Sequence, residues 1–204
     1  MNRRRHRRAI VVALAVAAAA AAAFVGMRAA VGPEPELQVL PRPGKPGRFD
    51  VSFQVMGTDA RFEVAAGGLK DAERMLTPAV ARTRLVESLM SNYRPESELS
   101  RLNREGAAGP VPVSEPTLTV LRRAIEMSHI SGGAFDVTYA PLRALWRQAA
   151  TDGRPPSQGE IDRVRAAIGS DKLIVTPDGV RFGAPGMEVD LGGIAKGYAI
   201  DMAS

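Results

Sequence analysis

The 204-residue sequence contains no cysteine and only two histidines. Without cysteine the chain can form no disulfide, carries no thiol nucleophile and offers no thiol for a lipid anchor. His6 lies in a basic N-terminal stretch, and His129 lies near the end of an expected helix, where a histidine is more often a C-terminal cation than a catalyst. No group of His, Asp and Glu has the spacing of metal ligands. The residues by themselves therefore show no complete catalytic set.

The chain also lacks an excess of basic residues once its first eight residues are set aside. Lys and Arg number 27 against 22 Asp and Glu, which gives a formal net charge of +5. Five of the arginines lie at the N-terminus: Arg3, Arg4, Arg5, Arg7 and Arg8. The other 22 basic residues balance the 22 acidic ones. We therefore expect no nucleic-acid partner.

An uncharged apolar run, Ala9 to Met27, follows the basic head. This order is typical of a secretory signal or of an uncleaved signal anchor, and its 19 residues are enough to span a bilayer. The arginines are expected to keep the N-terminus in the cytoplasm and to send the rest of the chain out. We assign residues 1–30 to a signal peptide or signal anchor. The protein is expected to be exported, periplasmic or otherwise extracytoplasmic, with anchoring in the inner membrane if the segment is not cleaved.

Residues 31–48 are expected to form an extended linker, because they contain five prolines and three glycines. The folded part, 49–204, begins with apolar residues that alternate with polar ones, which predicts a strand with one buried face. A second short strand over residues 61–64 can pair with it across a turn at 57–60. A hairpin is expected over 173–182 and a short strand over 187–191.

Four helices are expected between these strands. The first runs over 69–90 and is interrupted at Thr77-Pro78, with Ala79, Val86, Leu89 and Met90 on its apolar side. The second follows Ser114, turns Leu118, Leu121 and Ile125 inward, and closes at Gly132-Gly133. A short helix follows Pro141, and another has a capping box at 157–160 and ends at Gly169. The mixture lacks a regular βαβ alternation, which predicts the α+β class.

Two polar segments each allow a structural and a binding interpretation. Met56-Gly57-Thr58 follows a strand, where glycine allows the backbone to approach a ligand but serves a hairpin turn equally well. Phe135 and Asp136 follow a pair of glycines and would suit a heteroaromatic ring with N–H donors. They would equally suit a core ring and a capping carboxylate. The spacing alone favours the structural interpretation of both segments.

The stretch VDLGGIAKG combines features of an anion site. Asp190 lies in an apolar run and needs a partner, and Gly192-Gly193 allow a tight turn. The first amides of the following helix and Lys196 would then favour a phosphate. The spacing matches neither the P-loop nor the dinucleotide-binding fingerprint. A plain turn between strand and helix stays open as the alternative.

Four segments, VMGT, SNYRPESELSRLN, SGGAFDVTYAPLRALW and VDLGGIAKGYAID, occur in an order that resembles the ApbE family, the FAD:protein FMN transferases. The resemblance extends from about residue 49 to the end of the chain. It implies a single α+β, T-fold-like flavin transferase domain, with FAD as substrate and a divalent metal, usually Mg²⁺. It also implies that FMN is transferred to a threonine of an acceptor protein through a phosphoester bond, with release of AMP.

The resemblance also implies roles for particular residues. Met56 and Tyr93 would line the FAD site, and Ala134, Phe135 and Asp136 would hold the flavin or adenine portion. Asp190 would contact FAD, Lys196 would face it, and the carbonyl of Gly193 would ligate the metal. Many relatives carry an acid at the position of Lys196, so its role stays open.

The family pattern continues with a second half that these residues do not contain. It includes a T-S-G segment, a histidine before D-P-x-x-G, and an aspartate and a threonine that ligate metal. The domain is therefore expected to be incomplete at its C-terminus, with the catalytic histidine beyond residue 204. The expected partner is a flavin-acceptor protein, an exported or membrane redox subunit. Two alternatives stay open: a magnesium-dependent FAD pyrophosphatase, and a short flavin-binding chain without catalysis.

Overall fold

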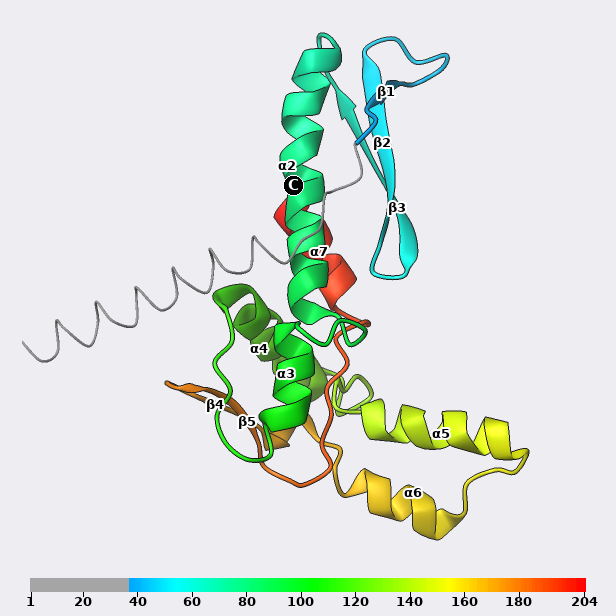
Figure 1. The fold of residues 1–204 in the computed structure, drawn as a ribbon, viewed down its shortest axis with the longest axis vertical. Helices are drawn as coiled ribbons and strands as arrows, with labels where there is room; N and C mark the ends of the chain where they lie inside the picture. The colour runs from blue at the N-terminus through cyan, green and yellow to red at the C-terminus, as the bar shows by residue number, and fades with distance from the viewer. Residues whose placement is uncertain (1–36) are drawn as a thin grey trace, which may run out of the picture. The chain divides into compact units, whose positions relative to one another are not determined.

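The computed structural model describes residues 37–204 (Figure 1). The expected signal or anchor segment, residues 1–30, lies outside the described residues. In chain order the elements are β1 (Leu40–Pro41), β2 (Arg48–Val55), β3 (Thr58–Ala65), α2 (Leu69–Met90), α3 (Glu98–Glu105), α4 (Glu115–Ile130), α5 (Ala140–Asp152), α6 (Gln158–Arg165), the 3-10 turn η1 (Ser170–Lys172), β4 (Leu173–Thr176), β5 (Gly179–Phe182) and α7 (Ala195–Ala203). The expected α+β class is confirmed.

The β2–β3 hairpin turns more tightly than the sequence predicted. Val55 pairs with Thr58, so Met56 and Gly57 alone form the turn, with φ of 51° and 69°. Positive φ at both positions is the type I′ geometry, which matches the right-handed twist of paired strands. β1 pairs with β2 in the same antiparallel sheet. Part of the stretch that we expected as a linker therefore belongs to the folded structure.

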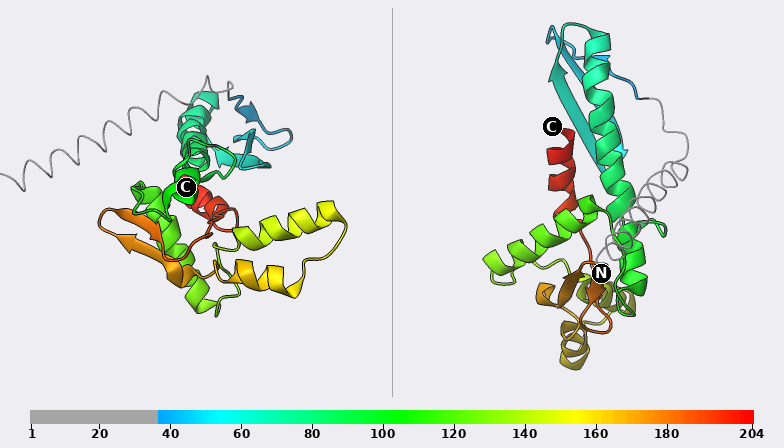
Figure 2. Two further views of the ribbon diagram at one scale, coloured as in Figure 1. Left: turned by 60° about the horizontal axis from the view of Figure 1, so that its bottom comes forward. Right: turned by 90° about the vertical axis from the view of Figure 1, so that its left-hand side faces the viewer.

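Helix α2 continues through Pro78, so the interruption expected there is wrong. Pro78 lies on the exposed side of the helix, where water can satisfy the carbonyl that loses its N–H partner. The four predicted apolar positions of α2 are all buried. The helix packs against the hairpin on one side and lies alongside α7 on another (Figures 1 and 2).

Polar side chains fix the positions of α3 and α4. Ser97 caps α3 by accepting a hydrogen bond from the amide of Ser100 at 2.9 Å. Glu98 reaches the start of α4, where its carboxylate accepts hydrogen bonds from the amide of Ser114 and the hydroxyl of Thr117. The second helix of our prediction is α4, and Leu121 is fully buried as expected.

The buried face of α4 is rotated from the predicted one. The fully buried residues on α4 are Thr117, Val120, Leu121, Ala124 and Ser128, whereas Leu118 and Ile125 are only half-buried. The prediction followed the largest side chains. The structure instead places small residues inward, where α4 approaches α2 and η1.

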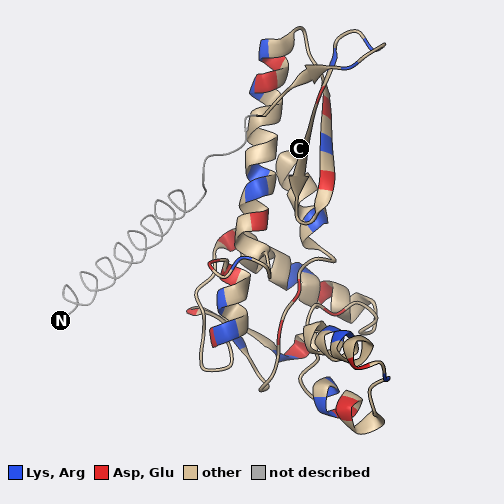
Figure 3. Ribbon diagram, turned by 45° about the vertical axis from the view of Figure 1, so that its right-hand side comes forward, with Lys and Arg blue, Asp and Glu red and all other residues tan. Residues whose placement is uncertain are grey.

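The predicted capping box of α6 and the β4–β5 hairpin are confirmed. Ser157 and Glu160 exchange hydrogen bonds at the start of α6, which lies beside α5 and ends at Arg165, before the expected Gly169. Pro177 and Asp178 connect β4 to β5. The basic and acidic residues of the described elements are interspersed (Figure 3). Within the described range, no helix combines the length and apolar character needed to cross a membrane.

The stretch 187–191 is buried except for Glu188 but is not a strand of either sheet, so the strand predicted there is wrong. Its backbone bonds instead to individual partners. The amide of Asp190 donates to the carbonyl of Val137 at 2.8 Å, and both backbone groups of Val189 bond to the side chain of Asn103. The apolar pattern of the sequence correctly predicted that these apolar residues are buried, but a strand also needs a neighbouring strand with which to pair.

Candidate functional site

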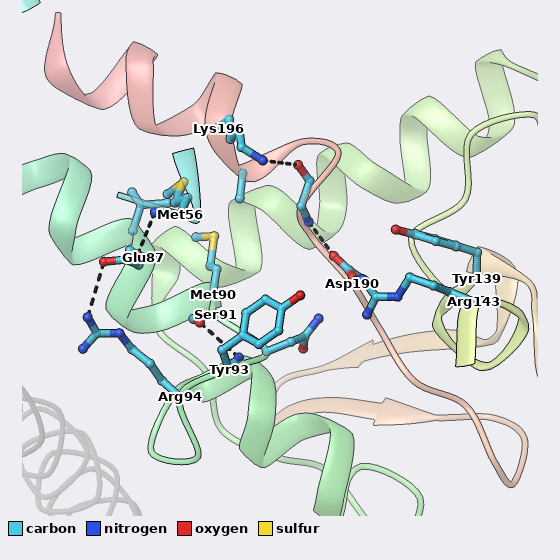
Figure 4. A pocket seen from close by; sticks show the side chains of 15 residues that line it. Met56, Glu87, Met90, Ser91, Tyr93, Arg94, Tyr139, Arg143, Asp190 and Lys196 are labelled. Atoms are coloured by element: carbon cyan, nitrogen blue, oxygen red, sulfur yellow. Dashed lines mark hydrogen bonds and ion pairs between the residues drawn. The ribbon is translucent and has the colours of Figure 1, made fainter. Parts of the chain in front are cut away.

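A pocket of about 620 Å³ lies where five parts of the chain meet (Figure 4). Its walls come from the β2–β3 turn, the last turns of α2, the loop 91–94, the start of α5 and the turn into α7. Four of the residues expected at a flavin site line it: Met56, Tyr93, Asp190 and Lys196. They come from separate segments of the sequence, and the fold brings them to one cavity.

The first wall is the turn at Met56-Gly57, which a hydrogen bond fastens to α2. The amide of Met56 donates to Oε1 of Glu87 at 2.6 Å. The other carboxylate oxygen of Glu87 pairs with Arg94 at 3.4 Å. Met56 is the only non-glycine residue with positive φ in the described range. The turn thus combines an uncommon backbone conformation with a charged acceptor from another element.

The second wall is the loop between α2 and α3. The carbonyl of Ser91 accepts hydrogen bonds from the hydroxyls of Ser97 at 2.6 Å and Ser100 at 3.1 Å, and the hydroxyl of Ser91 accepts one from the amide of Tyr93. The backbone of this loop is therefore held in place. Tyr93 is 80% exposed as a residue, so its ring is a flat surface on the pocket on which a planar ligand could stack.

The third wall contains Asp190, which the sequence identified as an acid in need of a partner. That partner is Arg143 of α5, which forms an ion pair with the carboxylate. The other carboxylate oxygen accepts a hydrogen bond from the amide of Gly192 at 2.8 Å. The guanidinium of Arg143 also lies 5.8 Å from the centre of the Tyr139 ring, within the range of a cation–π interaction.

Lys196 provides a cation at the start of α7. Its ammonium donates to the carbonyl of Gly192 at 3.4 Å, and it has no carboxylate partner among residues 37–204. The amides of the turn are less available than the sequence suggested. Gly192 donates to Asp190, and the next helix amides, of Ile194 and Ala195, donate to the carbonyl of Leu191. At this end of the pocket the side chain of Lys196, rather than these three amides, is available to an anion.

The segment Ala134-Phe135-Asp136 does not line the pocket. Asp136 accepts four hydrogen bonds at 2.6–2.9 Å, from the amides and hydroxyls of Thr138 and Ser170. Burial of the Asp136 carboxyl acts to raise its pKa, but these hydrogen bonds outweigh burial and lower it. The carboxylate thereby joins the chain after α4 to the turn η1.

Phe135 lies close to the turn that was expected to ligate metal. A methyl group placed on Gly193 would come within 3.3 Å of the Phe135 ring. Gly193 itself is exposed, and the described residues contain no group of three His, Asp or Glu side chains able to hold a metal ion. The neighbouring carboxylate of Asp190 is engaged by Arg143 and Gly192.

Four charged or aromatic pocket residues were not predicted as site residues: Glu87, Arg94, Tyr139 and Arg143. The sequence contains a signal for a residue such as Arg143, because a carboxylate in the apolar run at Asp190 needs a positively charged partner. Glu87 gave a weaker signal: it is an acid between the inward-facing Val86 and Leu89. Neither the Arg143–Asp190 ion pair nor the hydrogen bond between Glu87 and Met56 could be located from sequence alone, because each joins elements that are distant along the chain.

Comparison with known protein families matches residues 56–204 to the ApbE family. The chain is 34% identical over 158 residues to an FAD:protein FMN transferase of Vibrio cholerae, covering 76% of this chain and 47% of that protein. It is 31% identical over 155 residues to the FAD:protein FMN transferase of Salmonella typhimurium, covering 72% and 44%. The chain thus spans about half the length of the curated relatives it matches.

Solved structures show the same likeness. The flavin transferase ApbE from Vibrio cholerae superimposes with a TM-score of 0.66 at 33% identity, over 76% of this chain and 52% of that one. The ApbE protein from Thermotoga maritima gives the same TM-score at 24% identity, over 82% and 51%, which shows the shared fold.

Proposed function

The chain belongs to the ApbE family, and on that premise we propose that the protein transfers FMN from FAD to a threonine of an acceptor protein. The observation that carries the proposal is the convergence of Met56, Tyr93, Asp190 and Lys196 on one pocket of about 620 Å³. That volume lies within the range of pockets for small molecules and cofactors.

The lining of the pocket suits the two chemical parts of FAD. Arg94 and Arg143 are paired with Glu87 and Asp190, so Lys196 is the cation that leaves the charged lining with an excess of positive charge, which favours a diphosphate. Tyr93 and Met90 offer an aromatic face and a polarizable thioether to a planar ring. The sequence is similar to named FAD:protein FMN transferases over the segments that supply these residues.

The proposed reaction is a phosphoryl transfer. A bond forms between the threonine oxygen and the phosphorus on the flavin side, while the bridging P–O bond breaks and AMP leaves with the bridging oxygen. The threonine proton must pass to a base as the bond forms. The cations of the pocket would hold the diphosphate and offset its charge as the bond breaks.

Magnesium dependence remains a prediction from the resemblance. Gly193 would contribute a carbonyl oxygen, and the described residues contain no cluster of three acidic or histidine side chains that could complete the coordination. Titration of the complete gene product with Mg²⁺, after treatment with a chelator, tests this prediction.

The transfer is tested with the complete gene product, FAD and a peptide that contains a threonine from a candidate acceptor. Mass spectrometry should find FMN attached to the threonine, and chromatography should find one equivalent of AMP. The same peptide with valine in place of threonine is the control. FMN on neither peptide, with no AMP released, would contradict the proposal.

A second candidate, FAD hydrolysis, is separated by the same experiment. Release of free FMN and AMP without modification of the peptide would favour a pyrophosphatase, because water would then have accepted the phosphoryl group. Flavin binding without any AMP would favour a non-catalytic flavin-binding protein.

We propose that the protein acts outside the cytoplasm, on an exported or membrane redox subunit. The uncharged run from Ala9 to Met27 behind five arginines supports export. Fusion of residues 1–48 to a reporter that is active only after export tests the location. A reporter that stays inactive would contradict export.

A further inference from the structure

We propose that Glu87 is a positioning residue that holds the Met56 wall of the pocket in its ligand-binding conformation. The inference rests on the proposed function, because FAD is the ligand whose binding it concerns. Glu87 belongs to α2, whereas Met56 belongs to the turn of the β2–β3 hairpin. The hydrogen bond of 2.6 Å from the Met56 amide to Oε1 of Glu87 connects the two elements at the edge of the cavity.

The turn needs such an acceptor for a conformational reason. Met56 has a φ of 51°, a region that side chains other than glycine seldom occupy. The hydrogen bond from its amide offsets this cost, because a charged acceptor binds more strongly than a neutral one. Loss of the acceptor would free the turn to relax and would move the Met56 side chain, which faces the pocket in Figure 4.

Glu87 also connects this wall to the neighbouring loop 91–94. Its second oxygen pairs with Arg94, which follows Tyr93 in the loop 91–94. The Glu87 side chain is 21% exposed, so it is partly shielded from competing water. One carboxylate thus links the hairpin turn, the last turns of α2 and the loop that carries the exposed Tyr93.

The test measures FAD affinity by isothermal titration of the complete gene product. Glu87→Ala should weaken binding about tenfold or more, as expected for removal of a charged hydrogen-bond acceptor. Glu87→Gln keeps an oxygen for the Met56 amide, so about threefold weakening is expected. Glu73→Gln, on the exposed first turns of α2, is the matched control and should stay within about twofold of wild type.

A double-mutant cycle with Met56→Ala separates positioning from general destabilisation. If Glu87 acts through the Met56 wall, its substitution should cost less affinity in the Met56→Ala background than in the wild type. Losses that add in full would overturn the inference, because Glu87 would then act independently of Met56. If Glu87→Ala does not fold, the cycle is run with Glu87→Gln.

The failure of this inference is distinguishable from failure of the proposed function. Wild-type protein that does not bind FAD overturns the proposed function and this inference with it. If the wild type binds FAD and both Glu87 variants bind it with the same affinity and the same melting temperature, only the role of Glu87 is overturned.

Discussion

Asn103 offers a direct test of how the fold holds the candidate site. This half-buried side chain of α3 donates to the carbonyl of Val189 at 2.9 Å and accepts from the amide of Val189 at 2.8 Å. It also donates to the side chain of Asn92 at 3.1 Å. Val189 is fully buried and precedes Asp190, so Asn103 fixes the backbone on which the Arg143–Asp190 ion pair depends.

The magnitude follows from the groups that Asn103→Ala would leave without partners. The amide and the carbonyl of Val189 have no other hydrogen bond within residues 37–204. Leaving a buried polar group unsatisfied costs about 1–3 kcal/mol, so the pair should cost about 2–4 kcal/mol after partial relaxation. That is a large part of the roughly 5–15 kcal/mol by which typical domains are stable.

Urea unfolding of the complete gene product, monitored by circular dichroism, measures the loss in the free energy of unfolding. The loss is obtained from the shift in the midpoint urea concentration, provided that the dependence of that free energy on urea keeps the same slope. Asn92→Ala is the control, because it removes only the bond between side chains and should cost about 1 kcal/mol or less. FAD affinity should fall with Asn103→Ala as Asp190 shifts. A change in stability below about 0.5 kcal/mol would refute the reasoning, because water or a neighbouring group would then be satisfying Val189.

Three further predictions concern residues away from the pocket. Asp136 has a lowered pKa in the folded protein, so the stability that it contributes is complete above the unfolded pKa of about 3.9 and is lost as pH falls through the folded value. The melting temperature should therefore fall more steeply from pH 6 to pH 3 for wild type than for Asp136→Asn. Gly179→Ala should cost at least about 2 kcal/mol in urea unfolding, because φ is +139° and the new methyl would lie 2.2 Å from the carbonyl oxygen of Val111; an unchanged midpoint would contradict this. Ser157→Ala breaks the capping box with Glu160 and should cost about 1 kcal/mol, seen as faster amide exchange in the first turn of α6.

Local patterns in the sequence predicted the elements that local interactions determine. The capping box at Ser157, the β4–β5 hairpin and the apolar side of α2 depend on residues a few positions apart, and all three are confirmed. The outcome at Pro78 depended on tertiary structure. The helix continues because the residue faces solvent, and that orientation is set by what α2 packs against.

The predicted strand at 187–191 failed for a similar reason. Its apolar residues are buried as the pattern indicated, but pairing requires a second strand, and no described strand lies beside it. Likewise, the sequence showed that Asp190 needs a partner but could not identify Arg143. A sequence pattern indicates that an apolar group must be buried or that a polar group needs a hydrogen-bond or ion-pair partner. Which distant segment satisfies it is decided by the fold.

The segment SNYRPESELSRLN shows how the family motif divides between scaffold and binding surface. Ser97, Glu98 and Asn103 each bond to a different part of the chain, namely the Ser91 carbonyl, the start of α4 and the backbone of Val189. Their hydrogen-bonding groups are used within the protein, so a ligand would have to break existing bonds to engage them. Tyr93 is different, because its backbone amide is bonded to Ser91 while the residue as a whole is 80% exposed.

The same criterion applies to the residues that the family resemblance nominated. Asp136 is committed to five internal hydrogen bonds, whereas Lys196 donates only to a carbonyl of its own turn. A conservative change at Asp136 should therefore act mainly on stability, and one at Lys196 mainly on FAD affinity. The distinction is measurable: Lys196→Gln should weaken FAD binding about threefold to tenfold with an unchanged urea midpoint. Equal effects of Lys196→Gln on both quantities would show that Lys196, too, is part of the scaffold.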